Sequence, residues 1–156
     1  MYVDYSNAPH TIALAKQLSA DTNGDLETVE RIYHYVVSNI TYDHIKAENV
    51  AFNYLPDLDE ILKIKTGICF DYAALMAGLL RSCSIPTRLQ IGYAGSAYHA
   101  WVSVYLNDIG WIDGIIRFDG NAWSLMDPTF AANTQNTDTL RDFIGDGSNY
   151  QLLYTY

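Results

Sequence analysis

Hydrophobic residues in the first half of the chain recur every three or four positions, and this spacing predicts helices. Turn-rich or irregular runs, such as ADTNGD and the segment 40–67, separate these stretches. The last helix carries a wide apolar band, so it should be buried. The expected helices are residues 11–20, residues 25–39, a short piece from Leu58 to Lys63, and a long one from Cys69 to the terminating run Ser84–Pro86.

After Pro86 the pattern changes to alternating apolar and polar residues, which predicts strands. The four expected strands are TRLQIGYA (87–94), HAWVSVYL (99–106), GWIDGIIRF (110–118) and NAWSLMDP (121–128). The turns between them are short and favour antiparallel pairing. Helices followed by a meander indicate an α+β domain. The polar tail, residues 134–156, contains a possible short helix from Leu140 to Ile144.

Length and charge narrow the class of protein. The 156 residues, 49% of them hydrophobic, suit a single domain over residues 1–156. No apolar run approaches the ~20 residues of a membrane-spanning helix. A net charge of -9 disfavours binding to nucleic acid or anionic lipid. The first ten residues contain no secretory signal. The acidic, tyrosine-rich composition suits a bacterial, secreted or cell-surface domain whose signal lies outside this chain, and a cytoplasmic location stays open.

The two cysteines, Cys69 and Cys83, need separate explanations. A helix between them would hold them roughly 20 Å apart, beyond disulfide reach. Cys69 begins the apolar helix, where the partial positive charge of the helix terminus stabilises a thiolate and lowers the thiol pKa. Gly67 would let a substrate backbone approach the sulfur. The alternative is that Cys69 fills the core, as buried cysteines commonly do, and Cys83 is expected to be an inert packed thiol.

A thiol nucleophile needs a base, usually histidine, and an acid that orients the base. His99 opens an alternating strand, whereas His10, His34 and His44 lie in helical or loop regions. Alternatively, His99 is an ordinary exposed histidine on a strand and has no catalytic role. Asp127, in LMDPT two strands later, is the preferred acid, and Asp113 and Asp119 compete with it.

The chain resembles the transglutaminase-like superfamily of papain-related folds in the order of three residues. A cysteine lies at the start of a helix, a histidine follows on a strand, and an aspartate follows on a later strand. The resemblance rests on TGICFDYAALMAGLLRSCSIPTRLQIGY, on HAW, and on W-x-x-x-DPT at Trp123 to Thr129, and it covers roughly residues 42–130. It implies a papain-like core in which the nucleophile helix packs on an antiparallel sheet. By this resemblance Cys69 is the nucleophile, His99 the base and Asp127 the orienting acid.

Three further residues flank the expected site. Tyr42 in NITYD matches a position where the superfamily often has an aromatic residue, and its phenol can donate to an oxyanion or simply pack in the core. Trp101 would shield the imidazole or, as the favoured alternative, fill the core. Asp71 is explained by the helix macrodipole and is given no catalytic role.

The resemblance implies attack of Cys69 on a carbonyl carbon and a thioester acyl-enzyme. Water as acceptor gives a cysteine protease, which we expect, and a lysine amine gives a transglutaminase. The substrate would be a protein or peptide, with no cofactor and no metal. Two competing hypotheses are a catalytically silent peptide-binding module and zinc binding by Cys69, His99 and Asp127. The sequence does not decide between hydrolysis and transamidation. It also does not determine calcium regulation or the oligomeric state.

Overall fold

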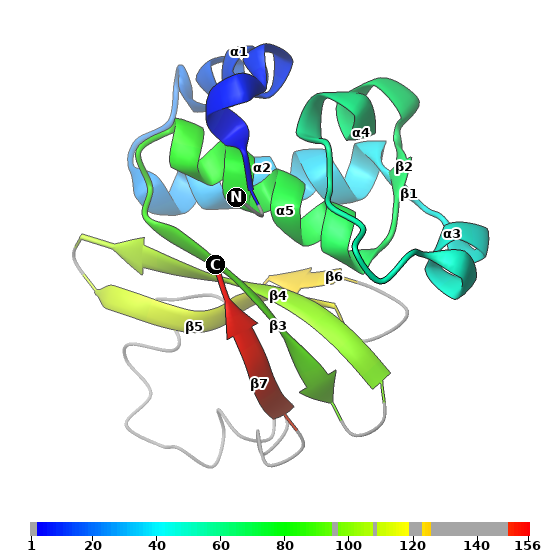
Figure 1. Ribbon diagram of the computed structural model, residues 1–156. Coiled ribbons are helices and arrows are strands. Elements are labelled where there is room, and N and C mark those ends of the chain that lie inside the picture. The colour runs from blue at the N-terminus through cyan, green and yellow to red at the C-terminus, as the bar shows by residue number, and fades with distance from the viewer. Residues whose placement is uncertain (1–2, 95–96, 108, 119–122, 126–149) are drawn as a thin grey trace.

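A computed structural model describes residues 3–94, 97–107, 109–118, 123–125 and 150–156. For residues 94, 97–99, 113–118, 123–125 and 150 it describes only the backbone. Asp119, Asp127 and the expected helix at 140–144 lie outside the described residues. The described helices form a layer on one face of a sheet (Figure 1). They are the 3-10 turn η1 (Tyr5–Asn7), α1 (Pro9–Ser19), α2 (Asp25–Asn39), α3 (His44–Asn49), α4 (Leu58–Ile64) and α5 (Cys69–Ser82).

The four helices expected from the hydrophobic spacing are confirmed within one or two residues at each end. The structure adds α3, in a segment that the sequence indicated as irregular. Its first turn is held by the Asp43 side chain, which accepts a hydrogen bond from the Lys46 amide at 2.8 Å. Six residues are too few to show a periodic apolar face, so the pattern could not predict this helix.

The larger sheet contains five strands in the order β6-β5-β4-β3-β7. The strands are β3 (Thr87–Ala94), β4 (Ala97–Leu106), β5 (Gly110–Phe118), β6 (Trp123–Leu125) and β7 (Tyr150–Thr155). The first four form the expected antiparallel meander. β4 begins two residues earlier than predicted, because Ala94 pairs with Ala97.

Strand β7 was not predicted. It pairs antiparallel with β3 and forms one edge of the sheet, where Leu152 and Tyr154 are about half exposed. Its apolar residues do not alternate cleanly with polar ones, and its partner lies more than 50 residues away in the sequence. A local pattern cannot reveal such a pairing, because the strand is stabilised by hydrogen bonds to a distant segment.

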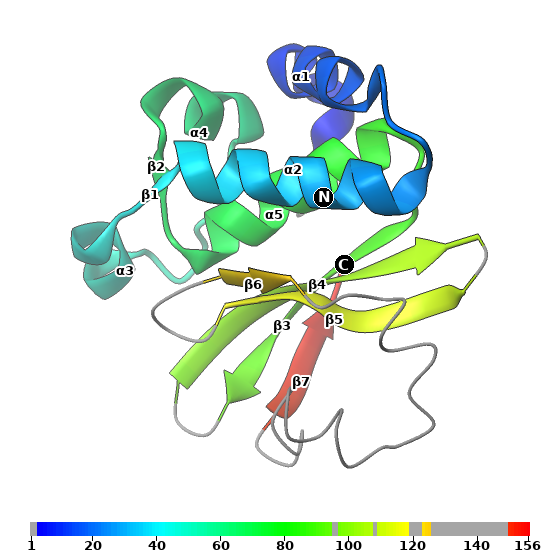
Figure 2. The ribbon, with the colours of Figure 1, turned by 180° about the vertical axis from the view of Figure 1, so that it is seen from behind.

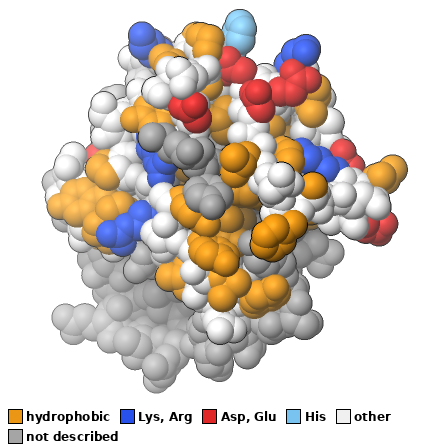
Figure 3. All heavy atoms as spheres, in the orientation of Figure 1, with side chains coloured by type: hydrophobic (Ala, Val, Ile, Leu, Met, Phe, Trp, Pro, Cys, Tyr) orange, Lys and Arg blue, Asp and Glu red, His pale blue; other side chains and the backbone are white. Residues whose placement is uncertain are grey.

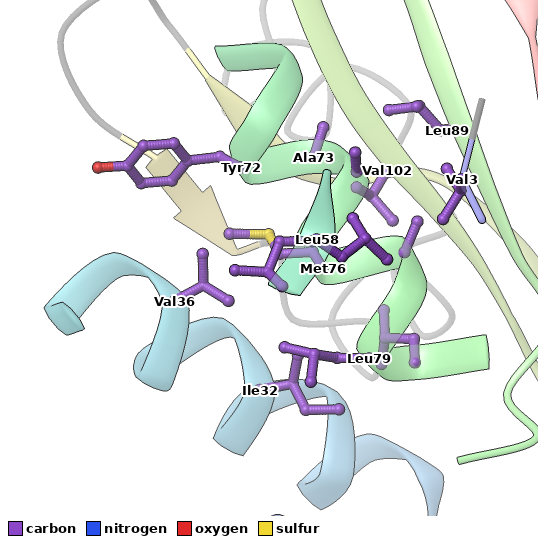
Figure 4. Close-up of a cluster of buried hydrophobic side chains, with 14 of the residues drawn as sticks. Val3, Ile32, Val36, Leu58, Tyr72, Ala73, Met76, Leu79, Leu89 and Val102 are labelled. Carbon is purple, nitrogen blue, oxygen red and sulfur yellow. The ribbon is translucent and has the colours of Figure 1, made fainter. Parts of the chain in front are cut away.

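Helix α5 lies at the centre of the core, between the sheet and α2. Its side chains from Ala73 to Leu80 are buried. Met76 and Leu79 lie toward Val36 and Ile32 of α2 (Figure 4). Seen from behind, α2 runs alongside α5 over the same face of the sheet (Figure 2). A helix that is apolar on all sides must be enclosed in this way, so the end of α5 that carries Cys69 is fixed between the two layers.

The surface in the orientation of Figure 3 divides by side-chain type. Acidic side chains gather mainly over the helical layer, and hydrophobic side chains are prominent over the described part of the sheet below it (Figure 3). In the part of the chain that the structure describes, no helix is long and apolar enough to cross a bilayer.

Candidate active site

A two-stranded parallel pairing brings Tyr42 beside the start of α5. Strand β1 (Thr41–Tyr42) pairs with β2 (Thr66–Gly67). The Thr41 amide donates to the Lys65 carbonyl, and the Asp43 amide donates to the Gly67 carbonyl, both at 2.9 Å. Because β2 ends two residues before Cys69, this pairing fixes Tyr42 next to the first turn of α5.

The Cys69 thiol is buried, with 9% of the residue exposed. Burial raises the pKa of Cys69 to about 11. The backbone N–H groups of Phe70, Cys69 and Ala100 act in the opposite direction and lower the pKa, whereas the Asp71 charge raises it further. Burial thus opposes the lowering expected from the helix terminus, because removal from water disfavours the charged thiolate. With these neighbours alone the thiol is neutral at pH 7, so attack requires a proton acceptor.

Strand β4 brings the residue after His99 near this thiol. His99 is within β4, opposite Gly92 of β3. The next residue, Ala100, is buried, and its backbone N–H lowers the pKa of Cys69. The structure thus brings the chain position of the predicted base to the predicted nucleophile. The His99 side chain lies outside the described atoms, so the sulfur–imidazole contact stays a prediction.

The predicted acids lie largely outside the described residues. Asp127 and the competitor Asp119 are both in undescribed segments. Asp113 is placed by its backbone alone, within β5. The choice among the three carboxylates therefore stays as the sequence left it, and zinc binding by Cys69, His99 and Asp127 stays untested for the same reason.

Tyr42 lies near Cys69 at the start of α5. Burial raises the pKa of Tyr42, whereas a hydrogen bond from the Cys69 backbone N–H lowers it. The Tyr42 ring also contacts the rings of His44 and Tyr72, with centroids 4.9 Å and 6.3 Å apart. The phenol and the Cys69 N–H are two potential donors to an oxyanion, and they lie together at the start of α5. The role of Tyr42 in catalysis stays a prediction.

Trp101 is tied into the sheet. Its indole N–H donates to Gln90 Oε1 at 2.8 Å, and the same oxygen accepts from the Ser103 hydroxyl. A Cβ added to Gly92 would lie 2.9 Å from the indole ring. The indole therefore packs closely over Gly92, the residue paired with His99. These contacts describe a packed side chain, and a shielding role for Trp101 stays a prediction.

The space beside Gly67 is occupied by Asp71. A Cβ added to Gly67 would lie 2.6 Å from Asp71 Cβ and 2.9 Å from Oδ2. Contacts this short do not occur between real side chains. A close approach to Asp71 is therefore a reason for glycine at this position, beside the predicted access for a substrate backbone.

Asp71 takes part in a buried cluster that the sequence did not reveal. Its carboxylate is fully buried and accepts three hydrogen bonds: from the Ile68 N–H at 2.8 Å, from Lys46 Nζ at 2.6 Å and from the Tyr54 hydroxyl at 2.5 Å. Its position in the first turn of a helix could have indicated the bond to Ile68. Lys46 and Tyr54 lie 25 and 17 residues away, and no sequence signal links them to Asp71.

Cys83 is a free thiol at the other end of α5. It is partly buried, and its Sγ lies 3.5 Å from the Ala15 carbonyl oxygen. Burial raises its pKa. Cys69 is also free, so the prediction that the two cysteines are not disulfide partners is confirmed.

Comparison with known sequences identifies relatives of this site. A family model described as the transglutaminase-like superfamily matches residues 12–114. The uncharacterized protein YebA of Bacillus subtilis is 30% identical over 124 residues, which cover 64% of this chain and 16% of YebA. UPF0252 protein MJ1282 of Methanocaldococcus jannaschii is 31% identical over 114 residues, which cover 64% of this chain and 32% of that protein. The chain thus spans less than a third of the length of either relative.

Solved structures with the same fold support this relationship. A protein from Cytophaga hutchinsonii that is assigned as a cysteine protease aligns with 97% of this chain and 43% of its own, at 20% identity and a TM-score of 0.59. The periplasmic domain of TgpA from Pseudomonas aeruginosa aligns with 79% of this chain and 43% of its own, at 23% identity and a TM-score of 0.56. At these identities the likeness concerns the fold. The family model covers most of the chain, including Cys69 and His99, and the chain belongs to the transglutaminase-like superfamily.

Proposed function

We propose that this domain is a thiol-dependent enzyme that hydrolyses amide bonds in a protein or peptide, with Cys69 as nucleophile, His99 as base and Asp127 as the acid that orients His99. The observation that carries the proposal is the proximity of the buried Cys69 thiol to Ala100, whose backbone N–H lowers the pKa of Cys69. The buried Cys69 thiol therefore lies near the residue that follows His99 in β4. Membership of the superfamily and the cysteine-protease assignment of a protein with the same fold support it.

The buried thiol gives the base a defined task. Because burial raises the pKa of Cys69 to about 11, the sulfur becomes a nucleophile only when its proton passes to the His99 imidazole. The sulfur then bonds to the substrate carbonyl carbon, and the carbonyl oxygen takes up the negative charge. The Cys69 N–H and the Tyr42 hydroxyl are the donors available to this oxygen.

Collapse of this intermediate breaks the carbon–nitrogen bond. The His99 imidazolium gives its proton to the departing amine, and a thioester remains on Cys69. Water then attacks the thioester carbonyl and gives its proton to His99. The products are a carboxylic acid and the regenerated thiol. An amine in place of water would form a new amide, which is the transglutaminase reaction.

The first test is the rate of Cys69 alkylation by iodoacetamide as a function of pH, followed by peptide mass spectrometry to separate Cys69 from Cys83. In His99→Ala the imidazole is absent, and burial should hold the inflection above that of a free thiol. In the unmodified protein, a neighbouring imidazole should move it well below the ~8.5 of a free thiol. His34→Ala is the matched control, because His34 is exposed on α2.

The second test separates the acceptors. Casein is incubated with the protein in the presence and absence of a fluorescent primary amine, with Cys69→Ala as the inactive control. Cleavage that is lost in Cys69→Ala supports the proposal. Incorporation of the amine without cleavage would make the domain a transferase.

In the alkylation test, equal inflections of the rate against pH in the protein and in His99→Ala would contradict the assignment of the base. That result would favour a silent binding module.

A further inference from the structure

The described part of the chain contains a second group of charged residues at the start of α5. Asp71 is fully buried, whereas the side chain of Lys46 is 25% exposed, so the ion pair between them lies at the edge of the core. Lys46 Nζ also donates to the Tyr54 hydroxyl at 2.7 Å and lies 4.2 Å from the centroid of the Tyr54 ring. We call Lys46, Tyr54 and Asp71 the α5 anchor.

The α5 anchor connects three separate segments. Lys46 belongs to α3, Tyr54 to the segment between α3 and α4, and Asp71 to α5. The Tyr54 ring also meets the Phe70 ring edge-on, with centroids 6.4 Å apart. In Figure 1, α3 lies beside the end of α5 at which Cys69 is placed. The anchor thus fixes the segment that leaves Tyr42 against the turn that carries the nucleophile.

Asp71 acts on the backbone next to Cys69. Its Oδ2 accepts from the N–H of Ile68, the residue before the nucleophile, at 2.8 Å. This bond fixes the Gly67–Ile68 peptide plane at the entry to α5, one peptide before the Cys69 N–H. Gly67 leaves the room that this arrangement needs, since an added Cβ would lie 2.9 Å from the same Oδ2.

A buried carboxylate two residues from a thiol also opposes the thiolate, and Asp71 raises the pKa of Cys69. Lys46 lies on the same carboxylate and compensates its charge. Burial, followed by the bond to Asp71, raises the pKa of Tyr54, so this phenol remains a neutral donor. The Asp71 carboxylate can therefore accept the hydrogen bond from the Ile68 N–H, while Lys46 limits how far its negative charge raises the pKa of Cys69.

We propose that the α5 anchor is a positioning unit for the nucleophile: Asp71 orients the backbone at Ile68 and Cys69, Lys46 neutralises Asp71, and Tyr54 ties both to the segment after α3. The inference rests on the proposed role of Cys69. It adds three residues that act through Cys69 and do not touch the substrate.

The test uses variants that change the charge in opposite directions. In Lys46→Met the carboxylate loses its cation, and Cys69 alkylation below its inflection should become at least about threefold slower. In Asp71→Asn the charge that opposes the thiolate is removed, and alkylation at the same pH should become at least about threefold faster. Lys46→Arg should restore most of the native rate. In both Lys46→Met and Asp71→Asn, kcat for peptide cleavage should fall with little change in KM.

Two variants elsewhere provide matched controls. Lys63→Met removes a surface lysine that is paired with Glu60 at 2.9 Å, and Tyr35→Phe removes a hydroxyl that accepts from Lys65. Neither pair includes a buried carboxylate, so alkylation of Cys69 should not change.

Tyr54→Phe is a further variant of the α5 anchor. It should slow alkylation less than Lys46→Met does, because the Lys46 cation remains. It keeps the proposal testable if Lys46→Met does not fold.

The opposite signs distinguish positioning from general loosening of the fold. A purely structural cluster would change the reactivity of Cys69 in the same direction in Lys46→Met and Asp71→Asn. Such a result, or rates equal to those of the controls, would overturn the proposal. The alkylation needs no substrate, and the variants are also measured in the His99→Ala background. If His99→Ala alkylates at Cys69 with the same pH dependence as the unmodified protein, the proposed function is refuted. The α5 anchor is then judged only by the rates of its own variants.

Discussion

In a His99→Ala variant, ionisation of Cys69 should destabilise the protein at alkaline pH. Burial raises the pKa of this thiol from 9.0 to about 11. Each pKa unit corresponds to about 1.4 kcal/mol, so a rise of this size amounts to roughly 3 kcal/mol of unfolding free energy. Between pH 9 and 11 the folded state keeps a proton that the unfolded state releases. This stabilisation is therefore complete below pH 9 and is lost as the pH rises through 11.

The assay is urea unfolding, followed by circular dichroism, at several pH values from 7 to 11. His99→Ala is compared with the double variant His99→Ala, Cys69→Ala, so that the titration of the 13 tyrosines is common to both. The difference in unfolding free energy between the two proteins should be constant up to about pH 8.5. It should then shift by about 2–3 kcal/mol toward pH 11, with the cysteine-containing protein losing stability.

A difference that does not change with pH would refute the reasoning. It would mean that the N–H groups of Phe70, Cys69 and Ala100 compensate fully for burial of the thiolate. The thiol would then be reactive without a base, and the task assigned to His99 would disappear.

Two further substitutions test the start of α5. Gly67→Ala places a Cβ 2.6 Å from Asp71 Cβ, and this overpacking should cost about 1–3 kcal/mol, or roughly 3–10 °C in the thermal midpoint; an unchanged midpoint would show that the turn can move at little cost. Tyr42→Phe removes the hydroxyl next to the Cys69 N–H and should lower kcat by about 100-fold at similar KM in steady-state peptide cleavage; an unchanged kcat would make Tyr42 a packing residue.

The sequence predicted those parts of the fold that depend on local spacing. The helices α1, α2, α4 and α5 and the meander from β3 to β6 each carry their own apolar period, so their type could be deduced from the order of residues. The start of α5 at Cys69 was predicted because the apolar band begins there. The resemblance then identified the superfamily, which the family model confirms.

The missed strands depend on distant partners. Strand β7 is held by β3, and β1 is held by β2 across more than 20 residues. Asp71 illustrates the same limit within the site. Its position at the start of a helix explained one interaction, with the helix dipole, whereas its partners Lys46 and Tyr54 became evident only in the folded chain.

The sequence by itself determined that a cysteine begins a buried helix, that a histidine lies on the second strand of a meander, and that the chain resembles one superfamily. Tertiary structure decided that the Cys69 thiol is buried, that this burial raises its pKa, and that Asp71 is paired with Lys46. The physical reason is that periodicity is a property of neighbouring residues. Burial and charge pairing depend on which distant segments pack together.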